Sequence, residues 1–90
     1  EQFDKEKLRK GLLKACEKRP IPVEKVDQIA DKIEANLTQL KQKEIPSKIL
    51  GERIMKELKK LDNVAYIRFA SVYRDFKDVD DFKKEIKQLR

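Results

Sequence analysis

Apolar residues recur along the chain at intervals of three and four positions, which is the spacing of an amphipathic helix. The pattern divides the chain into five segments separated by polar residues or prolines. We expect helices over residues 4–19, 22–40, 47–61, 62–76 and 78–89. No alternating run is long enough to predict a strand, although residues 1–3 could be the tail of one. The fold class is therefore mostly α.

The ends of these segments carry residues that favour helix starts and stops. Residues suited to the N-cap position open four of them: Asp4, Ser47, Asp62 or Asn63, and Asp78. Pro20 ends the first helix, because proline cannot continue one. Pro22 opens the second, since proline is tolerated in a first turn.

Two segments differ from an ordinary one-faced helix. Residues 64–76 carry apolar side chains on more than one face, which predicts a central helix. The last segment has a narrow stripe on an otherwise charged helix, formed by Val79, Phe82, Ile86 and Leu89. Such a stripe either folds back on the bundle or meets a partner.

Two glycines lie inside predicted helices. Glycine costs about 1 kcal/mol relative to alanine in a helix interior. Gly11 and Gly51 therefore indicate either close packing or the close approach of a ligand.

Composition limits the class of protein. Ninety residues form one domain with a modest core. The only cysteine is Cys16 and there is no histidine, so a Cys/His zinc site within the chain is excluded. A single cysteine cannot form an internal disulfide, so a reducing, cytoplasmic compartment is expected. No apolar run approaches the roughly 18 residues that a membrane span needs. The chain opens with Glu1 rather than methionine, so we expect it to begin inside a longer protein.

The chemistry of the side chains favours binding over catalysis. A nucleophile needs a neighbouring base, and without histidine Ser47, Ser71 and Cys16 are better explained as caps or packing residues. We therefore do not expect an enzyme. The net charge of +6 indicates an anionic partner, although a solvated Lys/Glu surface explains it as well. Lys5 and Lys7 oppose the dipole of the first helix, and a bound polyphosphate would remove that conflict.

Three blocks of the sequence resemble a known family. They are residues 11–20 (GLLKACEKRP), 45–51 (IPSKILG) and 61–76 (LDNVAYIRFASVYRDF). In this order and spacing they resemble the ATP-cone of the bacterial ribonucleotide-reductase transcriptional repressors, the NrdR family. Residues 1–8 resemble the second half of that family's nucleotide-binding motif. The resemblance covers about residues 1–82.

The resemblance implies a fold and a function. It implies a small four-helix bundle over 1–90 that is truncated at its N-terminus, with 78–90 as a C-terminal helix. The family's N-terminal β-hairpin cap would be largely missing. The family binds ATP and dATP as effectors, and the nucleotide controls the oligomeric state of a repressor of reductase genes. DNA and zinc are bound by an N-terminal four-cysteine ribbon, which this sequence lacks.

The resemblance also implies a set of nucleotide-binding residues. By position, these are Glu1 and Asp4 near the nucleotide, Lys7 at the phosphates, Pro46 and Ser47 at the base, and Tyr73 beside the base. Glu1 is the candidate for sensing the ribose 2′-hydroxyl, the group that distinguishes ATP from dATP. Core packing is the alternative for Tyr73, and a solvated charge is the alternative for Lys7. Phe3 is expected to staple the helix start rather than touch ligand.

Two other functions stay open. The first is a helical oligomerisation module that does not bind nucleotide, because the basic strand preceding the motif in the family is missing and the 79–89 stripe is unpartnered. Self-association is expected under this reading and under the nucleotide-binding one. The second is a basic nucleic-acid binder, which ranks last because the chain has no tryptophan, zinc site or clustered basic run.

Overall fold

The computed structural model describes residues 3–41 and 44–89. These residues form five helices: α1 (Lys5–Ala15), α2 (Val23–Thr38), α3 (Ser47–Leu61), α4 (Asn63–Tyr73) and α5 (Val79–Lys87). The described ranges contain no strand, which confirms the helical fold class. Of the possible strand tail at residues 1–3, Phe3 belongs to no strand, and the other two residues lie outside the described part.

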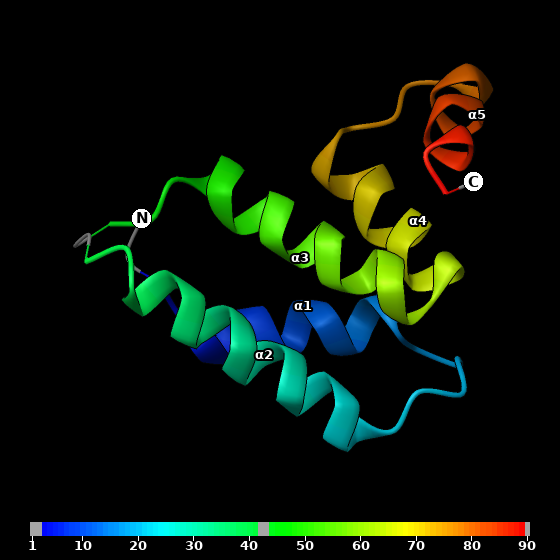
Figure 1. Ribbon diagram of the computed structural model, residues 1–90. Coiled ribbons are helices and arrows are strands. Elements are labelled where there is room, and N and C mark those ends of the chain that lie inside the picture. Colours follow the sequence, from blue (N-terminus) through cyan, green and yellow to red (C-terminus); the bar gives the residue numbers. More distant parts are fainter. Residues whose placement is uncertain (1–2, 42–43, 90) are drawn as a thin grey trace.

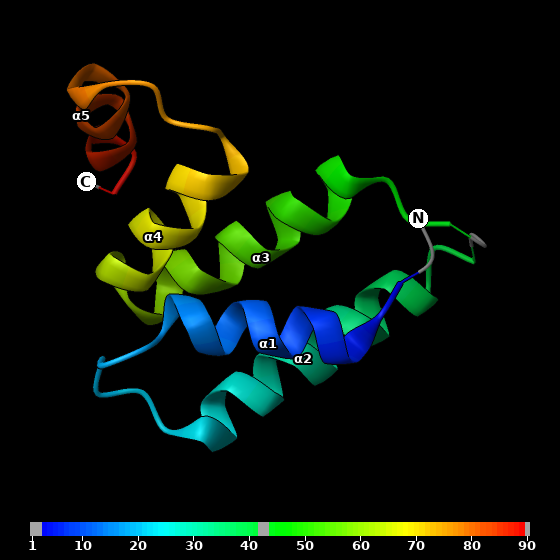
Figure 2. The same cartoon turned by 180° about the vertical axis from the view of Figure 1, so that it is seen from behind.

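The first four helices form a ring around one core. α1 and α2 pair in opposite directions, α2 contacts α3, α3 packs against α4, and α4 returns to contact α1 (Figure 1). α5 packs against α4 and stands outside the ring, as the view from behind also shows (Figure 2). α4 therefore has three neighbours, which agrees with the central position expected from its sequence. None of the described helices is long and apolar enough to cross a membrane.

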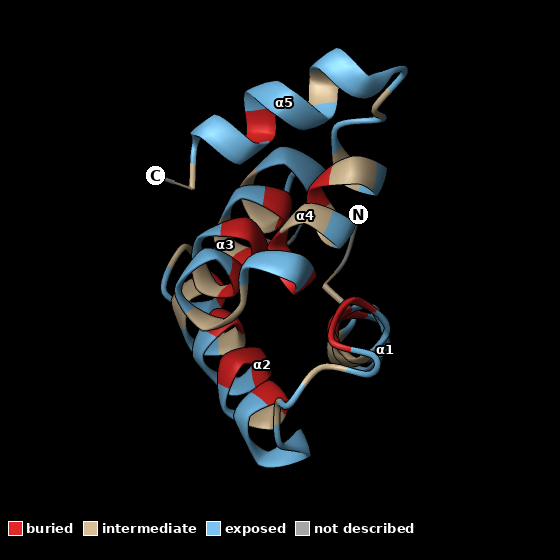
Figure 3. Ribbon diagram, turned by 90° about the vertical axis from the view of Figure 1, so that its right-hand side faces the viewer, coloured by how far each residue is buried: buried red, intermediate tan, exposed pale blue. Residues whose placement is uncertain are grey.

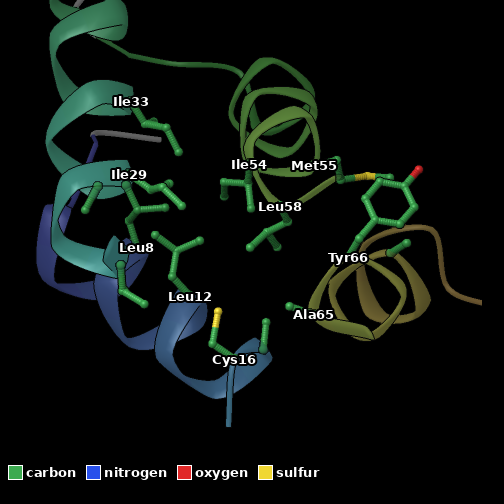
Figure 4. Close-up of a cluster of buried hydrophobic side chains, with 14 of the residues drawn as sticks. Leu8, Leu12, Cys16, Ile29, Ile33, Ile54, Met55, Leu58, Ala65 and Tyr66 are labelled. Carbon is green, nitrogen blue, oxygen red and sulfur yellow. The ribbon is translucent and has the colours of Figure 1, made fainter. Parts of the chain in front are cut away.

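The core is made of side chains that all four ring helices point inward (Figure 4). The largest fully buried side chains are Leu12, Val26, Ile33 and Leu58. They come from the predicted stripes of α1, α2 and α3, at three- and four-residue spacing. α4 contributes Ala65, Tyr66 and Ala70, and its small residues let α3 and α1 approach it closely.

Three aspartates cap helices as expected. Asp4 Oδ1 accepts a hydrogen bond from the Lys7 amide at 3.2 Å, at the start of α1. Asp62 accepts from the amide of the residue three positions on at 2.9 Å, and Asp78 does the same at 3.3 Å. Each bond satisfies an amide that the helix itself leaves without an acceptor.

Several predicted helix ends were wrong by a few residues. Ser47 is not an N-cap: it is the first residue of α3, Pro46 holds the cap position, and no side chain caps that end. α4 stops at Tyr73 instead of 76, because Asp75 adopts a φ of 53° that an α-helix does not allow. Pro22 precedes α2 as its cap residue and is not within its first turn. The ends of α1, α2 and α5 likewise fall a few residues short of the predicted 19, 40 and 89.

Asp62 ties the start of α4 to the loop between α1 and α2. Besides capping α4, its carboxylate accepts from Arg19 Nε at 3.1 Å. Burial alone would raise the pKa of Asp62, but the amide of Ala65 and the Arg19 guanidinium together hold that pKa below its usual range. The carboxylate is thus ionised and shared between two elements.

Arg68 adds a second link between α4 and α1. Its Nη1 donates to the carbonyl of Ala15 at 3.3 Å and to that of Glu17 at 2.5 Å. These carbonyls lie where α1 ends and have no helical partner. The positive charge of Arg68 also interacts favourably with the negative, C-terminal end of the α1 dipole. The two contacts fix how α4 crosses the ring.

Candidate functional site

A hollow of about 400 Å³ opens at one end of the helical ring. The first turns of α1 and α3 lie at that end (Figures 1 and 2), and the last turns of α4 close its side. The volume falls within the range of small-molecule pockets. The residues that line it are Phe3, Asp4, Lys7, Leu8, Gly11, Leu12, Ile45, Ser47, Leu50, Gly51, Ile54, Phe69 and Tyr73.

The hollow exists because α1 and α3 lie on opposite sides of the ring. Each contacts α2 and α4, whereas no direct helix–helix contact joins α1 to α3. Leu12 and Ile54, both buried, form its floor between those two helices. The mouth carries charged and polar side chains of the two first turns. The site is therefore apolar inside and polar at its rim.

Most of the predicted nucleotide-binding residues meet at this hollow. Asp4, Lys7, Ser47 and Tyr73 all line it, although they come from three helices and the turn before α1. Pro46 is adjacent to the lining at the α3 cap but is not part of it. Glu1 lies outside the described residues.

The two lysines at the start of α1 have different environments. Lys5 Nζ lies 2.6 Å from Asp31 and 3.2 Å from Glu34, both on α2. Hydrogen bonds to these carboxylates raise the pKa of Lys5. Lys7 is exposed at the rim, and in the described ranges it has no ion-pair partner. The α2 carboxylates thus compensate the unfavourable interaction of Lys5 with the positive end of the α1 dipole. The same interaction at Lys7 is left for an anionic ligand to compensate.

The start of α3 offers unpaired backbone donors to the same hollow. No side chain caps this helix, and its first turn contains no acidic residue. Ser47 lines the hollow directly. The positive end of α3 therefore points toward the same rim as Lys7 and the start of α1, which favours an anion or a hydrogen-bond acceptor there.

Tyr73 is held in place by contacts on three sides. Its hydroxyl donates to the Lys48 carbonyl at 3.2 Å, and its ring stacks on Phe69 with centroids 5.9 Å apart. A Cβ built on Gly51 would overlap the ring, with its Cδ1 only 2.7 Å away. Tyr73 is half-buried, so it is both a packing residue and a wall of the hollow. The two interpretations of Tyr73 are compatible.

The structure also adds lining residues that sequence reasoning missed. Leu50 and Phe69 supply much of the apolar wall. Of the two glycines, Gly51 marks close packing, whereas a Cβ on Gly11 would meet no atom within 4 Å. Gly11 lines the hollow, so its lack of a side chain keeps that space open. Phe3, which was expected to staple the helix start, packs against the core and lines the hollow as well.

Metal and thiol chemistry find no support at the site. No group of three or more potential metal ligands occurs in the part of the chain that the structure describes. Cys16 is buried in the core, and burial followed by the nearby Asp62 charge raises the pKa of its thiol. It is a packing residue, as its position on an apolar stripe predicted.

The chain belongs to the ATP-cone family, because the family model described as "ATP cone domain" matches residues 1–79. Among curated proteins it is 51% identical over 89 residues to the transcriptional repressor NrdR of Symbiobacterium thermophilum, covering 99% of this chain and 59% of that protein. It is 55% identical to the NrdR of Dehalococcoides mccartyi, covering 99% of this chain and 51% of that protein.

A third relative shows the same pattern. NrdR of Limosilactobacillus fermentum is 49% identical over 90 residues, which is 100% of this chain and 59% of that protein. The chain thus spans a little over half the length of the curated relatives it matches. These relatives are named transcriptional repressors, in agreement with the expectation that the chain does not catalyse a reaction.

Proposed function

We propose that the hollow binds an adenine nucleotide, ATP or dATP, and that the chain is the nucleotide-sensing module of a cytoplasmic transcriptional repressor. The observation that carries this proposal is the meeting of Asp4, Lys7, Ser47 and Tyr73 around one hollow. These residues lie up to 69 positions apart in the sequence, and all four are nucleotide-binding positions that the resemblance to the NrdR family implies.

The chemistry of the hollow suits the parts of the ligand. Phosphates would lie at the rim, where Lys7 and the first turns of α1 and α3 supply positive charge and backbone donors. The base would lie against the apolar wall of Phe69 and Tyr73, close to the turn at Ser47. Asp4 is occupied by its capping bond to the Lys7 amide, so its role is to hold the first turn in place.

The proposed output is a change of assembly. A nucleotide shifts an assembly equilibrium only as far as it binds the assembled forms with different affinity. ATP and dATP differ only at the ribose 2′-hydroxyl, and Glu1 remains the candidate for reading that group. By the NrdR resemblance, the whole protein would repress ribonucleotide-reductase genes, with DNA and zinc bound outside this chain.

Isothermal titration calorimetry with ATP tests the site. We expect Lys7→Ala to weaken ATP binding by at least tenfold, because it removes the unpaired rim charge. Lys10→Ala is the matched control: it is an exposed lysine of the same helix that does not line the hollow. Equal affinities for the two variants, or no binding of either nucleotide to the unmodified chain at millimolar concentration, would contradict the proposal.

One observation favours a second function, helical self-association without nucleotide. α5 leaves Val79, Phe82 and Ile86 exposed on one side. This surface does not overlap the hollow, so the two functions can coexist in one chain.

A further inference from the structure

The side chain of Arg74 lies between the wall of the hollow and helix α5. Arg74 is the C-cap residue of α4 and directly follows Tyr73, which lines the hollow. Its guanidinium carbon lies 6.0 Å from the centroid of the Tyr73 ring, at the distance of a cation–π contact. Its Nε lies 2.7 Å from Glu85 Oε1 of α5. One side chain thus contacts a residue of the hollow and a helix that does not reach the hollow.

Glu85 is a fixed anchor for this arginine. It is the only buried residue of α5, at 6% exposure, and it lies where α5 packs on α4 (Figure 3). Its second oxygen, Oε2, accepts a hydrogen bond from the buried Tyr66 hydroxyl at 2.6 Å. Leaving these partners would strand a charge and a hydroxyl away from water. The docked position of α5 therefore determines where the guanidinium of Arg74 lies.

Little else in the described ranges holds Arg74. Its other ionic partner, Glu52 of α3, is 3.9 Å from Nη2 and its side chain is 52% exposed. An exposed pair at this distance contributes little. The Arg74 side chain is itself 42% exposed, so without Glu85 it would gain many conformers in solvent. The ion pair with Glu85 is thus the contact that keeps the positive charge beside the Tyr73 ring.

The hollow can sense α5 only through α4. α5 contacts α4 and none of the other helices that the structure describes. The Tyr73 ring, at the end of α4, forms the apolar wall of the hollow together with Phe69. A ring that is held in place before a ligand arrives does not have to be ordered when the ligand binds, which favours binding. A contact that orders Tyr73 therefore raises the affinity of the hollow.

We propose that Glu85 and Arg74 are positioning residues for the nucleotide site: docked α5 holds Arg74 against Tyr73 and so raises the affinity of the hollow for nucleotide. The inference rests on the proposed function for the identity of the ligand, and it deepens that function by naming a contact that regulates the site. Because linkage is reciprocal, a nucleotide that binds against the positioned ring also stabilises the docking of α5.

Calorimetry with ATP on the 90-residue chain tests the role of Glu85. We expect Glu85→Gln to weaken ATP binding about two- to fivefold, the factor that corresponds to one partly exposed cation–π contact. Glutamine keeps the size of the side chain and an oxygen for the Tyr66 hydroxyl, but it lacks the charge that holds Arg74. Glu57→Gln is the matched control, because Glu57 is also an ion-paired carboxylate, 11% exposed, and does not line the hollow.

The outcomes of this comparison separate positioning from stability. Circular dichroism checks that each variant is folded. A merely structural role of Glu85 would lower the stability of the chain and leave its affinity for ATP unchanged. Equal affinities of Glu85→Gln and Glu57→Gln would therefore overturn the proposal.

A double-mutant cycle tests whether Glu85 acts through Arg74. Arg74→Gln should weaken ATP binding by about the same factor as Glu85→Gln, since either change frees the Tyr73 ring. In the Arg74→Gln chain, Glu85→Gln should then have no further effect on affinity. Two losses that multiply in the double variant would show independent effects, which contradicts the role of Arg74 as the link.

Hydrogen exchange tests the reciprocal effect on α5. Saturating ATP should slow the exchange of the α5 amides in the unmodified chain, because it stabilises the docked helix. The same addition should leave these amides unchanged in Glu85→Gln. Identical α5 exchange with and without saturating ATP in the unmodified chain would contradict the coupling.

The ring of Tyr73 gives a readout that needs no nucleotide. In a Tyr66→Phe chain Tyr73 is the sole tyrosine, so its ring protons can be followed by NMR. Adding Glu85→Gln should move these signals and adding Glu57→Gln should not, since Arg74 connects Glu85 to the ring. Moved signals in a chain that does not bind ATP would support the positioning contact and contradict the proposed function. Unmoved signals with ATP affinity intact would contradict this inference and leave the proposed function standing.

Discussion

Replacing each of the two glycines by alanine should have opposite effects on stability. Both residues lie within α-helices and neither has a positive φ, so alanine is allowed by the backbone at both positions. In a helix interior alanine is favoured over glycine by about 1 kcal/mol. At Gly11 a Cβ meets no atom within 4 Å, so this gain is realised in full. We expect Gly11→Ala to raise Tm by about 4–8 °C, the shift that 1 kcal/mol gives in a domain of this size.

At Gly51 the same gain is opposed by the Tyr73 ring. The new Cβ would overlap three ring atoms, so the ring would have to rotate away. Rotation would give up the hydrogen bond to the Lys48 carbonyl and the stacking on Phe69. Each of those contacts contributes about 0.5–1.5 kcal/mol, and overpacking typically costs about 1–3 kcal/mol. We expect Gly51→Ala to be less stable than the unmodified chain by about 1–2 kcal/mol.

Thermal and urea unfolding followed by circular dichroism would measure both effects. A second background identifies the cause: in a Tyr73→Ala chain the ring is gone, so Gly51→Ala should become stabilising by up to about 1 kcal/mol. If Gly51→Ala stabilised the chain that keeps Tyr73 as much as Gly11→Ala does, the clash with the Tyr73 ring would be refuted.

Three further predictions concern buried ionisable groups. Burial, and after it the hydrogen bond to Glu85, raises the pKa of Tyr66 to about 12. The resulting contribution to the free energy of unfolding is complete below pH 10 and should fall by about 2–3 kcal/mol between pH 10 and 12. Absorbance titration of Tyr73→Phe, in which Tyr66 is the sole tyrosine, measures that pKa. Asp62→Ala should cost about 1–3 kcal/mol in urea unfolding at pH 7, and the loss should shrink as pH falls through the lowered pKa of this carboxyl. Cys16 should react with a thiol reagent far more slowly in the folded chain than in urea; equal rates would contradict its burial.

The helices could be predicted from the sequence because their stripes are local. Leu8, Leu12, Ile29 and Ile33 lie at helical spacing, and all four are buried. The ends were less accurate, since they depend on single backbone angles. The φ of 53° at Asp75, which ends α4 early, leaves no signal that a periodicity argument can detect.

The site divides in the same way. Asp4, Lys7 and Tyr73 could be named through the resemblance, and they line one hollow. The apolar wall could not be predicted from the sequence, because Leu50 and Phe69 follow the same spacing as core residues. They differ from core residues only in that no neighbouring helix covers them on the side of the hollow. This side is uncovered because α1 and α3 lie on opposite sides of the ring and do not contact each other, which is a property of the tertiary fold.

The orientation of α5 was also beyond the sequence. Its stripe was expected either to fold back on the bundle or to meet a partner; in the structure Leu89 packs against the core, whereas Val79, Phe82 and Ile86 are exposed. The choice depends on Glu85, which finds Tyr66 and Arg74 only once α5 has docked on α4. The burial of a carboxylate can be predicted only once its hydrogen-bonding partners are known.

The most direct test of the central claim is to map ATP binding on the 90-residue chain by amide chemical shifts in ¹⁵N-labelled protein. If the hollow binds the nucleotide, millimolar ATP should shift the amides of the residues around it, Lys7, Gly11, Ser47, Gly51 and Tyr73. Lys7→Ala should reduce these shifts, and Lys10→Ala should not. Shifts spread over the exposed lysines of all five helices, or shifts absent from the hollow at millimolar ATP, would contradict this claim.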